Sequence, residues 1–249
     1  MRFLKKGHKE SDKSQNHKPN RQRGITFVEM SVSLAVLSII MSSLVFYHRG
    51  FTDRLEITNL AYDIALTIRE AQVSGSAVRG TDLGGFDHAF GIRFFIGGSG
   101  GNIGSDKAFI SFVDLSNGVG GDPDGLYNGN FNCRDEECIR KIEIGRGNFI
   151  KKVCWRENNS SLKCNSNTNS SPPRGVDITF LRPKLDATTK FLTYGGGWEG
   201  EGQVINNDGR EAVICLESPQ GGKKTVHVLP TGQIFVGEDN CPTVPGPGL

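Results

Sequence analysis

The pattern of hydrophobic and polar residues separates the chain into segments of different kinds. The first is ITFVEMSVSLAVLSIIMSSLVFY, Ile25 to Tyr47, which is apolar over 23 residues and carries one formal charge, Glu29. About 20 apolar residues are enough for a helix to cross a bilayer, so this run predicts a transmembrane helix. A charged side chain in lipid costs on the order of 2.5–3.5 kcal/mol on insertion scales. Glu29 is therefore a candidate functional residue; the alternative is that its side chain only reaches back to the lipid headgroups.

A helical pattern continues after the apolar run. Apolar residues recur every three to five positions over residues 48–80, with charged residues between them, as in an amphipathic helix; they are Phe51, Leu55, Leu60, Ile64, Ile68 and Ala71. Gly75 and Gly80 indicate its end. We expect one helix from Ile25 to about Ser74, whose second half lies against a soluble domain. The alternative is two helices separated at Arg49-Gly50.

The pattern changes to a period of two from about residue 86. Short segments rich in Val, Ile and Phe predict strands at residues 90–96, 108–113, 176–181, 212–216, 225–229 and 233–236. Two turn sequences, NNDG at 206–209 and PTG at 230–232, predict hairpins. A long helix followed by short strands predicts an α+β fold in which the helix packs on an antiparallel β-sheet domain.

Charge is distributed unevenly along the chain. Residues 1–24 contain eight Lys and Arg residues and two acids, which gives this segment a net charge of +6. The whole chain has a net charge of +2, so the remainder carries −4. This basic segment predicts a cytoplasmic N-terminus by the positive-inside rule. The negative remainder argues against a nucleic-acid partner, because binding to phosphates depends on clustered Lys and Arg.

All six cysteines lie beyond the apolar run, at positions 133, 138, 154, 164, 215 and 241. An even number on one side of a membrane indicates disulfides in an oxidising compartment. Sequence neighbours suggest the pairs Cys133–Cys138, Cys154–Cys164 and Cys215–Cys241, although other pairings stay open. Zinc is the competing interpretation, but the chain has no Cys-x2-Cys pair and no histidine at ligand spacing.

One segment has the composition of a cation-binding loop, DLSNGVGGDPDGLYNGN at residues 114–130. Calcium takes six to eight oxygen ligands in flexible geometry. The candidate ligands are Asp114, Asn117, Asp122, Asp124 and Asn128, with Asn130 beside them. The segment does not match the EF-hand spacing, and the alternative is a turn-rich loop without a metal. Calcium is the one cofactor that the sequence suggests.

The sequence gives no support for catalysis. The five histidines are scattered, and neither a nucleophile elbow nor a zinc-protease motif is present. The glycine-rich segment FIGGSGGNIGS at 95–105 lacks the Gly-Lys-Ser/Thr of a phosphate-binding loop. We therefore expect a protein that is not an enzyme.

The residues around the start of the apolar run carry a family resemblance. GITFVE, Gly24 to Glu29, closely resembles the G-F-T-L-x-E processing site of type IV pilins and type II secretion pseudopilins. An ordinary secretory signal would instead have a shorter apolar core and an A-x-A cleavage site after it. The resemblance implies that prepilin peptidase cleaves between Gly24 and Ile25 and methylates Ile25. It also implies that Glu29 pairs with a terminal amine, its own or a neighbouring subunit's, during assembly.

The resemblance implies a structural subunit, either a minor pilin or a pseudopilin, of a type IV pilus or type II secretion-like filament. VHVLPTGQIFV near the C-terminus resembles the H-type pseudopilins more weakly. The implied organisation is a cleaved leader at 1–24, a membrane helix at 25–47, its continuation at 48–80 and an extracytoplasmic domain at 81–249. Implied partners are the peptidase, other subunits and the inner-membrane assembly platform. The implied location is the inner membrane, with the C-terminal domain periplasmic or extracellular, and then the filament.

Two other functions remain open at this point. One is a pilus-tip adhesin or DNA-uptake subunit, in which the C-terminal domain binds a ligand. The other is an uncleaved single-pass membrane protein with a binding or enzymatic ectodomain, which would retain residues 1–24.

Overall fold

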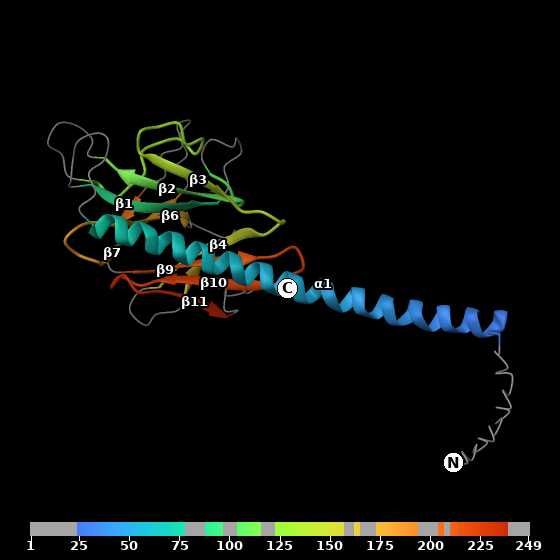
Figure 1. Ribbon diagram of the computed structural model, residues 1–249. Coiled ribbons are helices and arrows are strands. Elements are labelled where there is room, and N and C mark those ends of the chain that lie inside the picture. Colours follow the sequence, from blue (N-terminus) through green and yellow to red (C-terminus); the bar gives the residue numbers. More distant parts are fainter. Residues whose placement is uncertain are drawn as a thin grey trace, which may run out of the picture. The chain divides into compact units, whose positions relative to one another are not determined.

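The computed structural model describes residues 24–77, 88–96, 104–115, 123–156, 162–164, 173–193, 204–206 and 210–238 (Figure 1). The chain divides into two compact units, Met1–Tyr47 and His48–Leu249. One helix, α1, covers Phe27–Ser76. It runs through Arg49 and Gly50, so the alternative of two separate helices is not observed.

The second unit contains two antiparallel sheets. The six-stranded sheet has the order β3-β2-β1-β6-β7-β8 and the five-stranded sheet the order β11-β10-β9-β4-β5. The strands of the first sheet are β1 (Ala89–Phe95), β2 (Ala108–Asp114), β3 (Cys138–Glu143), β6 (Pro173–Phe180), β7 (Ala187–Thr193) and β8 (Val204–Asn206). Those of the second are β4 (Phe149–Arg156), β5 (Lys163–Cys164), β9 (Glu211–Glu217), β10 (Lys223–Val228) and β11 (Ile234–Glu238). A helix with antiparallel sheets confirms the predicted α+β fold.

The core of this unit joins α1 to both sheets. Ile57, Ala61, Ile64 and Ile68 recur at steps of three and four, so they share one face of the helix, and each is at most 1% exposed. They belong to one buried cluster with side chains of β1, β2 and β6 from one sheet and of β4, β9 and β10 from the other. The apolar face of α1 therefore holds the two sheets in one domain.

The C-terminal end of α1 lies close to β6. A Cβ atom at Gly75 would overlap the carbonyl oxygen of Phe180, so this close approach requires glycine. The glycine that the sequence suggested as a helix end thus serves the packing of the helix on the sheet.

The two predicted hairpins have different outcomes. PTG at 230–232 joins β10 to β11, where Leu229 N donates to Gln233 O at 2.9 Å, so this hairpin is confirmed. The prediction at NNDG, 206–209, is wrong: β8 precedes it in the six-stranded sheet and β9 follows it in the five-stranded sheet. The segment therefore connects sheets. Residues 207–209 themselves lie outside the described residues.

Six strands coincide with predicted segments, whereas β3, β4, β5, β7 and β8 were not predicted. In β4 a bulge between Ile150 and Lys152 places the buried residues Ile150 and Val153 three positions apart, which removes the period of two. In β7 one of the buried positions is Thr189, whose hydroxyl donates to Arg210 O at 3.1 Å. Both strands therefore lack the alternation that identifies a strand in sequence.

Candidate processing and assembly site

Gly24 and Ile25 lie in an open, irregular segment directly before α1. No atom lies within 4 Å of a Cβ built on Gly24, and Ile25 is 75% exposed. The Gly24–Ile25 peptide bond is therefore accessible to a protease. Because α1 begins at Phe27, cleavage at this bond would leave the helix intact.

Thr26 caps the first turn of α1. Its Oγ1 accepts a hydrogen bond from Glu29 N at 3.3 Å, and its carbonyl oxygen accepts one from Met30 N at 3.1 Å. A Thr followed three residues later by Glu is the sequence of a capping box, a signal that our sequence reasoning missed. Glu29 is the acid of the first turn, where a negative charge is favoured by the positive end of the helix dipole. A freed amine at Ile25 would add a second positive charge at this end.

The apolar part of α1 is suited to a lipid or protein environment. Phe27–Val45, 19 residues, is long and apolar enough to cross a membrane, and none of it is buried within the chain. Three serine hydroxyls donate to helix carbonyls at 2.7–2.8 Å: Ser31 to Val28, Ser33 to Glu29 and Ser38 to Leu34. These hydrogen bonds reduce the free-energy cost of placing the serine hydroxyl groups in lipid. The carboxylate of Glu29 is thus the polar group of this segment that most needs a partner.

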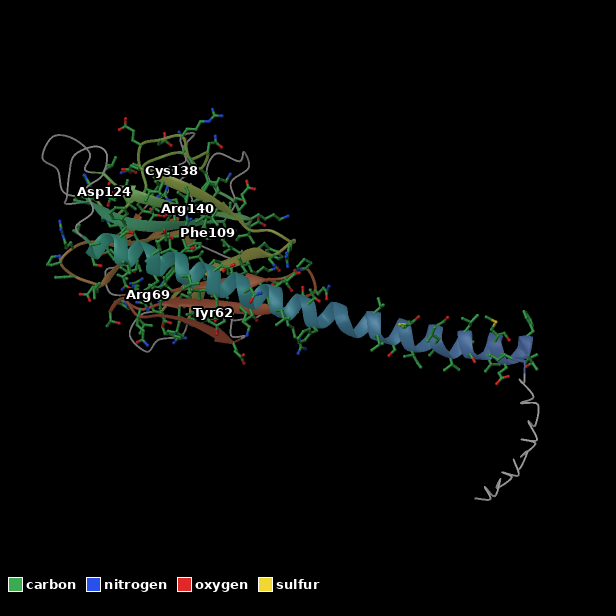
Figure 2. The ribbon with its side chains drawn as sticks, in the orientation of Figure 1. Tyr62, Arg69, Phe109, Asp124, Cys138 and Arg140 are labelled. Carbon is green, nitrogen blue, oxygen red and sulfur yellow. A yellow bond between two sulfur atoms is a disulfide. The ribbon has the colours of Figure 1, made fainter. Side chains whose placement is uncertain are left out.

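The second half of α1 exposes an apolar stripe, which we call the outer stripe. It consists of Phe51, Leu55, Tyr62, Leu66 and Val73, which are 46–66% exposed. Figure 2 labels Tyr62 on α1. With 3.6 residues per turn, the five directions fall within about 60° of one another, opposite the buried face. Our sequence analysis grouped Phe51 and Leu55 with Ile64 and Ile68 on one face, and this part of the prediction is wrong. A helix that covers a soluble core normally has one apolar stripe, so the outer stripe is a candidate interaction surface.

Two disulfides are present in the β-sheet unit. They join Cys133 to Cys138 and Cys154 to Cys164, which are two of the pairs of sequence neighbours. Cys215 is also disulfide-bonded, and its Sγ lies 3.9 Å from that of Cys154. Cys241, its predicted partner, lies outside the described residues, so this pairing stays a prediction.

The predicted calcium loop is organised by carboxylates that accept backbone hydrogen bonds. Asp114 Oδ2 accepts from Gly125 N at 2.5 Å, and Asp124 Oδ1 from Leu126 N at 2.8 Å. Asn128 Nδ2 donates to Asp124 Oδ2 at 3.2 Å. Asn117 and Asp122 lie outside the described residues. Within the described part of the chain, no three Asp, Glu, His or Cys side chains form a metal-binding group.

Sequence reasoning missed the partners that surround this loop. Glu137 Oε2 accepts a hydrogen bond from Asn128 N at 2.7 Å, and Asp177 Oδ2 accepts one from Tyr127 N at 3.0 Å. Asp177 also forms a bidentate ion pair with Arg93, at 2.7 and 2.5 Å. Asp177 lies 50 residues from Tyr127 in sequence, so no local motif could have indicated it. Glu137 lies only nine residues after Asn128 but belongs to no motif that marks it as a partner of the loop.

Burial makes part of this acid cluster sensitive to pH. Desolvation raises the pKa of Asp114 to about 7, from an ordinary value of 3.8; the Gly125 N–H opposes the shift, and the carboxylates of Asp124 and Glu137 add to it. Burial also raises the pKa of Glu137, and it raises that of Tyr127 to about 12. At neutral pH the carboxyl group of Asp114 is therefore close to its pKa.

Comparison with known proteins identifies the N-terminal segment. The family model of the prokaryotic N-terminal methylation motif matches residues 19–45, which include Gly24, Ile25 and Glu29. The match confirms the resemblance to type IV pilins and pseudopilins. No curated protein and no solved structure matches the chain.

We expect the free energy of unfolding to depend on pH through Asp114. The folded state binds a proton at Asp114 more tightly than the unfolded state, so the contribution of this group to stability is lost as pH rises from about 4 to about 7. Because one pKa unit corresponds to about 1.4 kcal/mol, the loss is on the order of a few kcal/mol. Asp114→Asn keeps an oxygen for the Gly125 N–H and removes the titration. The difference between wild-type and variant unfolding free energies in urea should change across this range, and a pH-independent difference would contradict the prediction.

Calcium binding by the loop at 114–130 stays a prediction from the sequence. A bound cation would stabilise the ionised carboxylates of Asp114 and Asp124 and, by mass action, the folded state. Millimolar calcium at pH 7 should therefore raise Tm relative to EDTA in the wild type. Asp124→Asn should abolish the increase, and magnesium serves as the matched control ion. Equal Tm values in calcium and EDTA would rule out a calcium site in this loop.

Proposed function

We propose that the chain is a minor pilin or pseudopilin, a structural subunit of a type IV pilus or type II secretion-like filament. The observation that carries this proposal is the accessible Gly24–Glu29 motif placed directly before an exposed apolar helix. The subunit contributes packing surface to an assembly and no catalytic chemistry of its own.

Processing prepares the helix for assembly. Prepilin peptidase cleaves between Gly24 and Ile25, and the new amine at Ile25 is methylated. Glu29 then neutralises a terminal amine, either its own or that of an adjacent subunit. A paired charge is tolerable in a low-dielectric bundle, whereas loss of one partner is strongly destabilising. Glu29 thus selects the register in which helices enter the filament.

Assembly uses α1 over both of its halves. The apolar first half, Phe27–Val45, packs against the helices of other subunits after it leaves the lipid. The outer stripe of the second half supports the same mode of packing, because it presents five large apolar side chains away from the domain core. Because these side chains are already about half buried, covering the rest of each stabilises the assembly by about 1–2 kcal/mol before losses of motion.

The location follows from charge and cysteine chemistry. The basic segment at residues 1–24 keeps the N-terminus in the cytoplasm, so the domain after α1 is periplasmic or extracellular. The disulfides of this domain support an oxidising compartment. The partners are the peptidase, the inner-membrane assembly platform and the other filament subunits.

Mass spectrometry of the N-terminus tests processing. Protein from membranes of a host with active prepilin peptidase should begin at Ile25 and carry a methylated amine. Gly24→Val should block cleavage and leave Met1, since a β-branched side chain replaces the small residue before the bond. Gly7→Val, a matched change elsewhere in the leader, should be processed normally. An intact leader in the wild type would refute the proposal.

Two variants of α1 test assembly. Glu29→Ala removes the carboxylate that meets the amine, and Leu66→Glu places a charge in the outer stripe. Each should reduce incorporation into filaments by about tenfold or more, because each costs more than about 1.4 kcal/mol at an interface. Both variants should retain the unfolding midpoint of the wild type.

Ile139→Glu is the matched control for Leu66→Glu. Ile139 is 51% exposed on β3 and lies outside the outer stripe, so this change also replaces an exposed apolar side chain with a charge. Incorporation of Leu66→Glu at the level of Ile139→Glu would show that the outer stripe is not an assembly surface.

A further inference from the structure

The exposed side of α1 follows a seven-residue repeat. Exposed residues in alternating steps of four and three form one line along the helix, which we call the seam; they are Leu55, Asn59, Tyr62, Leu66, Arg69 and Val73. The seam includes the outer stripe except Phe51, and Figure 2 labels Tyr62 and Arg69. Steps of four and three are the spacing of the a and d positions through which one helix of a coiled coil contacts another. The seam therefore has the geometry to receive a single helix.

Two polar residues, Asn59 and Arg69, interrupt the seam. A polar residue in a coiled-coil seam lowers stability but selects register and partner, because it needs a complementary group on the facing helix. The guanidinium group of Arg69 has no carboxylate partner in the described part of the chain. A wholly apolar helix on the seam would remove water from this charge without replacing it. A helix that fits the seam must therefore present a carboxylate at the level of Arg69.

The guanidinium group of Arg69 is held in position by the fold. Gln72 is 4% exposed, and its Nε2 donates to backbone carbonyls of two separate turns, Leu185 O at 3.0 Å and Gly232 O at 2.9 Å. These two hydrogen bonds fix the amide so that its Oε1 accepts a hydrogen bond from Arg69 Nη1 at 2.5 Å. The other N–H groups of the guanidinium fork stay available to a carboxylate. Arg69 is thus oriented before a partner arrives.

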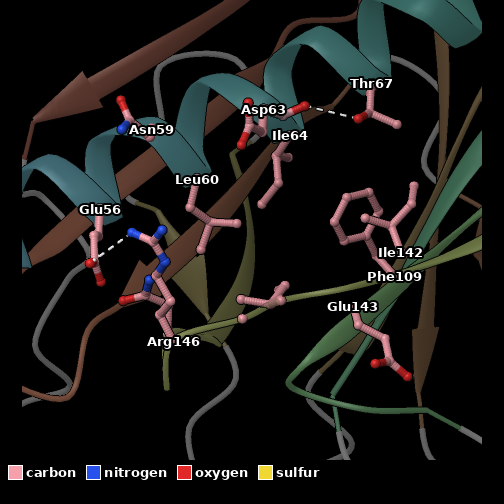
Figure 3. A pocket seen from close by; sticks show the side chains of 13 residues that line it. Glu56, Asn59, Leu60, Asp63, Ile64, Thr67, Phe109, Ile142, Glu143 and Arg146 are labelled. Carbon is pink, nitrogen blue, oxygen red and sulfur yellow. Dashed lines mark hydrogen bonds and ion pairs between the residues drawn. The ribbon is translucent and has the colours of Figure 1, made fainter.

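A second copy of this helix does not supply the missing carboxylate. In a parallel pair in register, Arg69 of one copy faces Arg69 of the other, and like charges oppose association. Of the acids beside the seam, Glu56 and Glu70 are already in ion pairs with arginines of the β-sheet unit, at 2.8 and 2.7 Å; Figure 3 shows the first. The remaining one, Asp63, lies six residues before Arg69, which is about 9 Å along the helix. The complementary acid must come from a different chain.

We propose that the seam binds one helix of a different filament subunit, and that this helix carries an Asp or Glu opposite Arg69. Apolar side chains of the partner pack on the apolar positions of the seam, and the acid forms an ion pair with the positioned guanidinium group. Arg69 thereby determines specificity, since it favours an acid-bearing helix over another copy of this chain. The inference rests on the proposed function, because it names the partner of the outer stripe.

A charge-reversed copy of the chain serves as the acid-bearing partner in the test. Full chains that carry a donor or an acceptor dye at the C-terminus are mixed in detergent micelles, and their association is measured by energy transfer. The pair of wild type with Arg69→Glu should associate at least about fivefold more strongly than either chain with itself, since opposite charges replace like charges in the seam. Far-UV circular dichroism checks that the variant is folded.

Arg54→Glu is the matched control for Arg69→Glu. Arg54 is also exposed on α1 but lies outside the seam, so its reversal makes the same change of charge on the same helix. It should associate with the wild type no more strongly than the wild type does with itself. Equal strength of the mixed pair and the wild-type pair, or an equal gain with Arg54→Glu, would overturn the role of Arg69.

Incorporation into filaments tests the natural partner. Arg69→Glu should reduce incorporation by about fivefold or more, Arg69→Lys should reduce it less because the charge is kept, and Arg54→Glu should incorporate like the wild type. Normal incorporation of Arg69→Glu beside the wild type would refute this inference and leave the proposed function intact. Absence of the wild-type chain from filaments would instead refute the proposed function, and the measurement in micelles would still decide whether the charge at Arg69 selects the partner.

Discussion

The packing of one helix face determines the rest of this structure. Ile57, Ala61, Ile64 and Ile68 are buried together with side chains from both sheets, so without α1 the two sheets would lose a shared part of their core. The same helix also carries the apolar segment before residue 47 and the outer stripe. Because one face is committed to the domain, the outward direction of the stripe is fixed by the core. The domain thus orients the surface with which α1 can meet a partner.

Sequence reasoning was successful where the chemistry is local. The apolar run, the motif at Gly24–Glu29 and the strands with regular alternation are each contained in a few consecutive residues, and the helix and the α+β fold follow from them. It failed where the signal depends on tertiary structure. The bulge at Ile150 removes the alternation of apolar residues in β4, and the buried Thr189 interrupts it in β7, so neither strand was predicted. The connection at 206–209 can be assigned only when the sheet of each neighbouring strand is known.

Some residues of the candidate sites could be predicted from the sequence and others could not. Gly24, Ile25 and Glu29 could be named from sequence because the methylation motif consists of contiguous residues. Asp177 could not, because it reaches the 114–130 loop only through the pairing of β6 with β1. Glu137 lies close to the loop in sequence, but no motif marks it as a partner. Phe51 and Leu55 show a third case. Their spacing is helical, but periodicity alone does not state which of two apolar faces is turned inward.

The exposed edge strand β3 has a consequence for how molecules of this kind can associate. Its backbone is paired on one side only, with β2, and most of its side chains are exposed. An open edge can recruit a strand from another molecule and lead to uncontrolled aggregation. Here the strand carries Arg140, Lys141 and Glu143, and charged side chains on an edge oppose such recruitment. Growth by strand addition at the β3 edge is thereby suppressed.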